Sequence, residues 1–133
     1  MEKYKFSLSL AIVCMSIFFL TNSSYAATHA ISGRVFNDKN CNGQLNGPDT
    51  GIAGVTMTLN PGAITTLTAG DGTYSFPGLV MGSYTVKETL PGGYCATTPT
   101  KVAVTIKNKK VTNIDFGDSQ STISPPDLCC PAP

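Results

Sequence analysis

The stretch Gly54-Val55-Thr56-Met57-Thr58-Leu59-Asn60 alternates apolar and polar side chains along its length. Val55, Met57 and Leu59 fall at every second position, and threonine or asparagine follows each of them. Because a strand points successive side chains to opposite faces, this period of two predicts a strand with one buried face. Valine and threonine also favour extended backbone. The stretch therefore predicts β structure rather than a helix.

Six further segments are expected to be strands, because they show the same alternation or are rich in β-branched and aromatic residues. They are residues 30–36, 64–68, 73–76, 83–88, 101–107 and 111–116. Turn formers such as Asn60-Pro61-Gly62 and Pro91-Gly92-Gly93 separate the segments. Seven short strands joined by turns predict an all-β fold of antiparallel strands, either a sandwich or a barrel.

The loop of residues 38–49, after the first of these segments, is rich in side-chain oxygens. They fall at loop positions one, three, five, nine and twelve, and Gly43 occupies position six, where the chain must turn sharply. This is the ligand spacing of an EF-hand-type calcium loop. The predicted ligands are the side chains of Asp38, Asn40, Asn42, Asn46 and Asp49 and the backbone carbonyl of Gln44. The alternative is a metal-free loop held by Asx turns.

Residues 1–26 predict a secretory signal peptide. Lys3 and Lys5 precede an apolar run over residues 6–20, and small residues at Ser24 and Ala26 suit cleavage after Ala26. Because the run is short for a membrane span, we expect no stable span after cleavage and a secreted or cell-surface protein. An uncleaved anchor is the alternative.

The remaining chain is expected to form one domain over residues 27–117 and a flexible tail rich in serine, proline and cysteine over residues 118–133. Removing Glu2, Lys3 and Lys5 reduces the nine basic and eight acidic residues to seven of each. A net charge near zero gives no support to nucleic-acid binding or to a basic membrane patch. Catalysis is not expected either, because the single histidine, His29, suggests no nucleophile and base pair.

Two longer motifs run through the expected domain. The first is Gly33-x-Val35-x-x-Asp38-x-Asn40-x-Asn42-Gly43, and the second is Thr68-Ala69-Gly70-Asp71-Gly72-x-Tyr74-x-Phe76, followed by Pro91-x-Gly93-Tyr94. Together they resemble the SdrD B-like repeats of bacterial serine-aspartate-repeat surface proteins, over about residues 31–117. The resemblance implies one prealbumin-like Greek-key β-sandwich, related to collagen-adhesin B-type domains. It also implies a calcium-rigidified structural role at the bacterial surface.

The loop departs from the family pattern at two positions. Family loops usually carry aspartate at position nine and glutamate at position twelve, where this chain has Asn46 and Asp49. The loss of one charge and the shorter Asp49 side chain predict weak calcium binding, with a Kd on the order of 0.1–1 mM. At ~1 mM calcium, a Kd of ~0.1 mM would add roughly 1.4 kcal/mol to stability.

Collagen-adhesin domains often close a lysine–asparagine isopeptide bond beside a buried glutamate, and Glu88 falls where that glutamate would lie. The first strand offers Arg34 where a lysine is needed, and a guanidinium stays protonated. Asn113 therefore lacks a reaction partner, and no crosslink is expected. We expect Glu88 to be a structural carboxylate that accepts hydrogen bonds from backbone N–H groups of the turn at residues 91–94.

Four cysteines follow the signal peptide, and an exported chain favours disulfides. If successive strands alternate in direction, Cys41 and Cys95 lie at the same end of the molecule. A bridge between them would stabilise the fold by roughly 4 kcal/mol in the chain-entropy model. The alternative is that neither forms a disulfide. Cys129 and Cys130 are open to a vicinal disulfide, to pairing with another chain, or to the reduced state.

Two functions therefore remain open. One is a non-catalytic, calcium-binding structural or adhesive module. The other is an exported binding domain that recognises an extracellular protein or a carbohydrate through its loops or a sheet edge.

Overall fold

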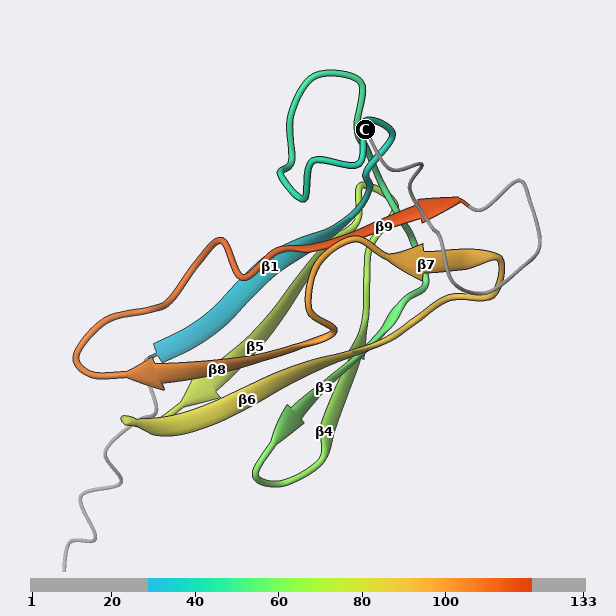
Figure 1. The fold of residues 1–133 in the computed structure, drawn as a ribbon. Coiled ribbons are helices and arrows are strands. Elements are labelled where there is room, and N and C mark those ends of the chain that lie inside the picture. The colour runs from blue at the N-terminus through green and yellow to red at the C-terminus, as the bar shows by residue number, and fades with distance from the viewer. Residues whose placement is uncertain (1–28, 121–133) are drawn as a thin grey trace, which may run out of the picture.

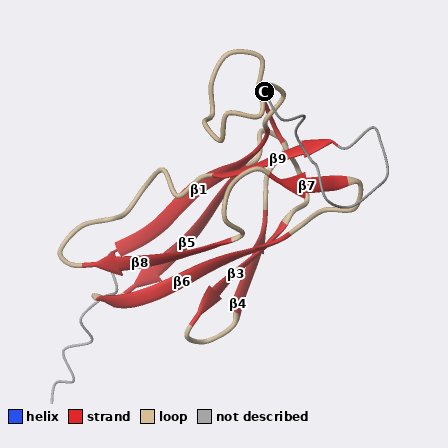
Figure 2. Cartoon of the chain, in the orientation of Figure 1, coloured by secondary structure: helices blue, strands red, loops and turns tan. Residues whose placement is uncertain are grey.

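A computed structural model describes residues 29–120, and these residues fold as a β-sandwich (Figure 1). The strands are β1 (His29–Asn37), β2 (Thr50–Gly51), β3 (Thr56–Asn60), β4 (Ile64–Leu67), β5 (Thr73–Leu79), β6 (Gly82–Thr89), β7 (Tyr94–Ala96), β8 (Lys101–Ile106) and β9 (Phe116–Gln120). Figure 2 shows strands and loops but no helix in this range, so the predicted all-β class is confirmed. A helix that could span a membrane is therefore not found between residues 29 and 120. The expected signal peptide lies outside the described residues.

The strands form two sheets whose inner faces enclose the core. One sheet has the order β4-β3-β6-β8, and all its neighbours are antiparallel. The other has the order β2-β1-β9-β7, with β5 paired to the first part of β1. The alternating pattern predicts either a sandwich or a barrel, and the two packed layers are the sandwich that the family resemblance implies, with one apolar face of each sheet buried.

One pairing differs from the expected antiparallel arrangement, because β1 and β9 run parallel. Val35 lies opposite Phe116, and Asn37 lies opposite Asp118. The chain leaves β8 and joins the other sheet beside β1, where Val111 forms an isolated parallel bridge with Ile31. The chain therefore already runs in the direction of β1 when it enters β9.

The last strand also lies further along the chain than expected. The predicted strand over residues 111–116 is wrong, because only the bridge at Val111 and the first residue of β9 fall within it. β9 continues to Gln120, past the predicted domain boundary at Gly117. Its sequence shows no apolar alternation, yet four of its five residues are buried, because neighbouring strands flank it on both sides.

The core lies between the two sheets and uses the alternating positions that the sequence marks. Both sheets contribute fully buried side chains, among them Ile31, Val35, Met57, Leu59, Val86 and Phe116. The ring of Tyr74 packs edge-on against Phe76, with ring centroids 5.8 Å apart. No residue of loop 38–49 belongs to this hydrophobic core.

Candidate metal-binding loop and buried carboxyl pair

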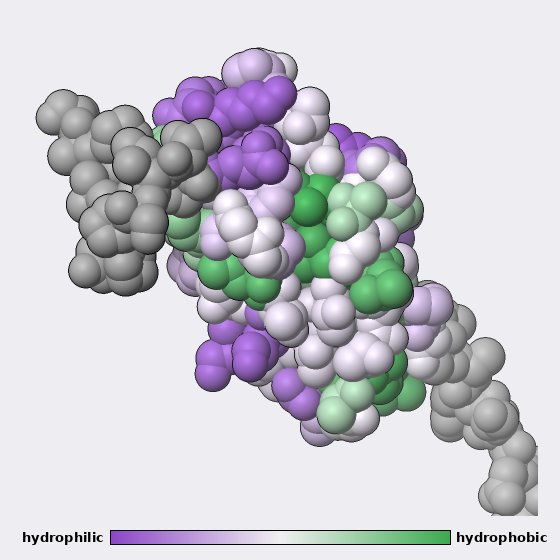
Figure 3. All heavy atoms as spheres, turned by 90° about the vertical axis from the view of Figure 1, so that its right-hand side faces the viewer, coloured by the Kyte–Doolittle hydropathy of each residue, from purple (hydrophilic) through white to green (hydrophobic). Residues whose placement is uncertain are grey.

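Loop 38–49 connects β1 to β2 and projects from one end of the sandwich, at the top of Figure 1. Figure 3 shows hydrophilic surface gathered at this same end of the molecule. The loop is therefore placed on a rigid scaffold, with a strand at each end.

The Asp38 carboxylate is buried where the loop leaves β1. Its Oδ1 accepts the N–H of Asn42 at 3.1 Å, and its Oδ2 accepts the N–H of Gly43 at 2.7 Å. Gly43 has a φ of 70°, which a residue with a Cβ rarely adopts. The N–H of Asp38 donates to the carbonyl of Asp118 at 2.7 Å, which fixes the start of the loop to β9.

Asp49 closes the loop from its other end. Its Oδ1 accepts the N–H of Lys39 at 3.0 Å, and its Oδ2 accepts the N–H of Asn46 at 2.9 Å. Both predicted carboxylate ligands, Asp38 and Asp49, thus turn toward the backbone of the loop rather than toward solvent.

The predicted amide ligands form a second set of hydrogen bonds. Asn42 Oδ1 accepts the N–H of Gln44 at 2.9 Å, and Asn40 Oδ1 accepts the N–H of Asn42 at 3.3 Å. Asn40 Nδ2 donates to Asn46 Oδ1 at 3.0 Å. The two bonds to backbone N–H groups are Asx turns, the local geometry that the metal-free alternative describes.

The chemistry of these side chains fits a hard cation. A carboxylate or amide oxygen that accepts one N–H keeps further acceptor capacity, and calcium takes six to eight oxygen ligands. The loop carries two carboxylates and three amides, which are hydrogen-bonded within the loop. Between residues 29 and 120, three or more histidine, cysteine, aspartate or glutamate side chains do not gather into a metal site.

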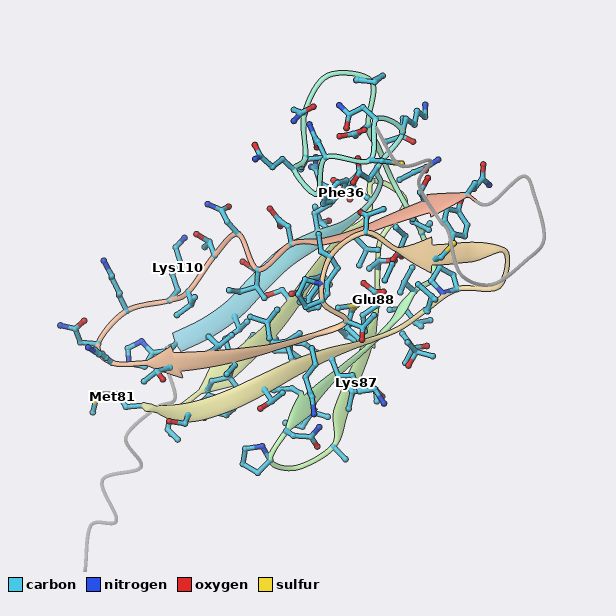
Figure 4. The ribbon with its side chains drawn as sticks, in the orientation of Figure 1. Phe36, Met81, Lys87, Glu88 and Lys110 are labelled. Atoms are coloured by element: carbon cyan, nitrogen blue, oxygen red, sulfur yellow. The ribbon has the colours of Figure 1, made fainter. Side chains whose placement is uncertain are left out.

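Glu88 occupies a different environment from the one predicted. It is 2% exposed, and Figure 4 shows its side chain between the sheets, whereas Lys87 points to the opposite face of β6. Neither carboxyl oxygen has a hydrogen-bond donor in the described chain, and the N–H of Tyr94 donates to the Pro91 carbonyl instead, at 3.2 Å. The expectation that the turn at residues 91–94 satisfies Glu88 is therefore wrong.

The neighbour of Glu88 is Asp118, a fully buried carboxyl on β9 of the opposite sheet. Burial raises the pKa of Glu88 to about 8, and the negative charge of Asp118 contributes to this rise. Burial also raises the pKa of Asp118 to about 6, although the hydrogen bond with Glu88 opposes that rise. Two ionised carboxylates have no proton to donate, but a protonated Glu88 donates its O–H to Asp118. A proton held between the two carboxyls would link the two sheets.

Arg34 and Asn113, the residues considered for an isopeptide bond, lie elsewhere. Together with Leu45 and Asp115 they line a surface pocket, and Glu88 is not part of its wall. The Arg34 guanidinium lies 3.8 Å from the carboxylate of Asp71. The three residues that a crosslink would need are therefore not brought together.

Cys41 and Cys95 both lie beside Ser119. The sulfur of Cys41 is 3.8 Å from the hydroxyl oxygen of Ser119, and Cys95 lies opposite Ser119 in the β7–β9 pairing. Both cysteines are thus at the end of the sandwich that carries loop 38–49. The pairing of their sulfurs stays a prediction, and Cys129 and Cys130 lie outside the described residues.

Comparison with known proteins identifies close relatives of the sequence. The profile of the SdrD B-like domain family matches residues 29–123. Serine-aspartate repeat-containing protein F of Staphylococcus epidermidis is 43% identical over 81 residues, which are 58% of this chain and 4% of that protein. Colossin-A of Dictyostelium discoideum is 35% identical over 106 residues, 74% of this chain and 1% of that protein. The chain thus spans a very small part of these relatives.

Solved structures share the fold at low sequence identity. GBS52, the minor pilin of Streptococcus agalactiae, has a TM-score of 0.52 and 21% identity, covering 76% of this chain and 49% of that one. The Bacillus anthracis TIE protein has a TM-score of 0.52 and 14% identity, covering 71% of this chain and 17% of that one.

The fold and these matches define a class, the β-sandwich domain with the fold seen in a minor pilin. Within that class, the chain belongs to the SdrD B-like domain family, which confirms the resemblance seen in the sequence.

Proposed function

We propose that this protein is an exported structural module whose loop 38–49 binds calcium and stiffens one end of the β-sandwich. The observation that carries the proposal is the inward turn of Asp38 and Asp49 onto the loop backbone. Family membership supports a structural rather than a catalytic role.

Six residues would hold the ion, five through side-chain oxygens and one through its carbonyl: Asp38, Asn40, Asn42, Gln44, Asn46 and Asp49. A bound cation would stabilise the folded loop, because several of its oxygens would be ligands of one ion. Asp38 connects the loop to the rest of the fold, since its N–H is hydrogen-bonded to the Asp118 carbonyl of β9. The ion would therefore stabilise both the loop and the junction of β1 with β9.

Thermal unfolding of the chain from residue 27 onward tests the calcium proposal. We expect ~1 mM calcium to raise the Tm by roughly 5 °C or more over the value in EDTA, because ~1.4 kcal/mol is gained when the Kd is ~0.1 mM. Asp49→Asn should remove most of this rise. Asp71→Asn, which alters an exposed carboxylate outside the loop, should keep it. Equal Tm values for the wild-type chain in EDTA and in calcium would contradict the proposal that the loop binds calcium.

We also propose that the chain is exported, with removal of residues 1–26, and acts at the cell surface or outside the cell. Export is supported by the basic start of the chain, by the apolar run over residues 6–20 and by the small residues Ser24 and Ala26. Mass spectrometry of the protein from its native cells should find an N-terminus at or next to Ala27. An intact Met1 on the exported protein would contradict it.

A second role, recognition of an extracellular protein or glycan, is favoured by the pocket that adjoins loop 38–49. Its wall combines the charged side chains of Arg34 and Asp115 with the amide of Asn113 and with Leu45 from the loop. A glycan array and a pull-down from extracellular proteins test this role. Binding that survives Asn113→Ala would place recognition elsewhere.

A further inference from the structure

Strand β4 forms an open edge of its sheet. It pairs with β3 on one side, and no strand of residues 29–120 pairs with its other side. Ile64 and Leu67, at its two ends, are 48% and 62% exposed. Such an edge presents backbone N–H and C=O groups that can pair with another strand.

The register of β3 and β4 shows which backbone groups face outward. The N–H of Thr68 donates to the Val55 carbonyl at 3.0 Å, and the Thr68 carbonyl accepts the N–H of Gly54 at 3.0 Å, so both backbone groups of Thr68 point toward the β3 side. Hydrogen-bonded and non-hydrogen-bonded residue pairs alternate along antiparallel strands. The backbone of Thr66 is therefore hydrogen-bonded to β3, and the backbones of its two neighbours in β4 are not. The backbone groups of Thr65 and Leu67 therefore point to the open side.

This edge also lacks the protection that the other edges carry. β8 begins with Lys101, β5 contains Pro77, and β2 and β7 have only two and three residues. β4 contains neither charge nor proline, and residues 50–70 include no charged side chain. Charge and proline are two of the usual means by which edge strands avoid pairing, and β4 has neither; at four residues β4 is short, but it is longer than β2 and β7.

We propose that β4 pairs antiparallel with β4 of a second copy of this chain, about a two-fold axis at Thr66. Thr65 would then lie opposite Leu67 of the second copy, and each such pair would exchange both backbone hydrogen bonds. The side chains agree with this register. Met57 and Leu59 of β3 face the core and are paired with Thr66 and Ile64, so the side chains of Thr65 and Leu67 lie on the outer face. A register shifted by one residue would place an outer-face side chain opposite an inner-face one.

A second copy suits this edge better than an unrelated charged segment. Two identical uncharged strands meet without like-charge repulsion, whereas a charged peptide would find no opposite charge on β4. The strand is short, so the interface is small and belongs to the weak, transient class. Self-association is therefore expected when many copies lie close together.

Sedimentation equilibrium over about 0.01–1 mM tests the pairing, since a weak interface has a Kd in or near this range. The wild-type average mass should rise toward that of a dimer. Thr65→Lys should remain monomeric, because it places two lysines at the joined edges. Thr58→Lys adds the same charge to the outer face of β3, one strand inward, and should dimerise like wild type. Melting curves establish that both variants fold.

Amide hydrogen exchange locates the contact. The amide protons of Thr65 and Leu67 should gain protection as concentration rises, whereas that of Thr66 should be protected at every concentration. A wild-type chain that stays monomeric throughout overturns the proposal. The proposal is also overturned if Thr58→Lys loses the dimer to the same extent as Thr65→Lys. That result would assign the contact to the face of the sheet and not to its edge.

Discussion

At the scale of single residues, the carboxyl pair of Glu88 and Asp118 makes the core sensitive to pH. Each side chain comes from a different sheet, and neither has a donor other than the shared proton. A buried acid whose folded-state pKa is raised binds its proton more tightly in the folded chain than in the unfolded chain. Folding is therefore favoured where the pair is protonated and loses that support as pH rises.

We expect stability to fall between about pH 5 and pH 9. The Glu88 pKa is about 8 in the folded chain against 4.5 ordinarily, and that of Asp118 is about 6 against 3.8. Because the folded state holds more protons in this window, the Tm at pH 9 should lie at least about 4 °C below that at pH 5, which corresponds to ~1 kcal/mol. Melting curves of the chain across this range measure the effect.

Glu88→Gln tests the origin of that decline. Glutamine stays neutral and can donate to Asp118, so the fall in Tm toward pH 9 should become much smaller. Asp71→Asn removes an exposed carboxyl and should leave the decline unchanged. A steep decline that persists in Glu88→Gln would show that another group causes it.

The sequence predicts the loop residues better than it predicts this pair. The oxygen-bearing side chains of residues 38–49 are recognisable because they lie close together at fixed spacing. Glu88 and Asp118 lie far apart in the chain and become neighbours only when the sheets pack. Local spacing carries no signal for such a contact, and the polar sequence of β9 places Asp118 in the expected tail.

At the scale of elements, the segment between β8 and β9 is held against β1 by close backbone contact. The hydroxyl of Tyr74 donates to the Ile114 carbonyl at 2.6 Å, and the N–H of Ile114 donates to the Ser32 carbonyl at 3.2 Å. A Cβ added at Gly33 would overlap the carbonyl of Ile114. Glycine is thus required at Gly33 for space rather than for an unusual φ.

Gly33→Ala should destabilise the domain by at least about 3 kcal/mol, because the overlap is with backbone and cannot be relieved by a side-chain rotation. The midpoint of urea unfolding measures the loss. Gly92→Ala is the matched control, since a Cβ there meets no atom within 4 Å. Similar midpoints for both variants would contradict the close approach of the segment to β1.

Alternation predicts elements well where one face is buried and the other exposed. β3 and β8 follow this rule, with Met57 and Leu59 buried in one and Val104 and Ile106 in the other. It fails for β9, where Asp118 and Ser119 are buried by neighbouring strands on both sides. It also misses β2 and β7, which are too short to show a period.

At the scale of the whole molecule, the cysteines are expected to tie the loop end of the sandwich together. Cys41 and Cys95 both lie beside Ser119, which supports a disulfide between them or a bridge from each to Cys129 or Cys130. Peptide mapping without reduction distinguishes these pairings.

Reduction should lower stability by roughly 2–5 kcal/mol, the usual cost of losing a native disulfide in a small exported domain. Melting the chain with and without reductant measures it. If Cys41 pairs with Cys95, the Cys41→Ser variant should melt near the reduced wild type and respond little to reductant, whereas two bridges to Cys129 and Cys130 would leave it a clear response. Identical melting curves for the oxidised and the reduced wild-type chain would contradict a stabilising disulfide.

The parallel pairing of β1 with β9 has a mechanical consequence. His29 begins β1 at one end of the sandwich, and Gln120 ends β9 at the other (Figure 1). A pulling force applied through these two ends acts along the strands, so the hydrogen bonds between them are loaded together in shear instead of opening one after another. A domain tethered at both ends is thereby arranged to resist extension.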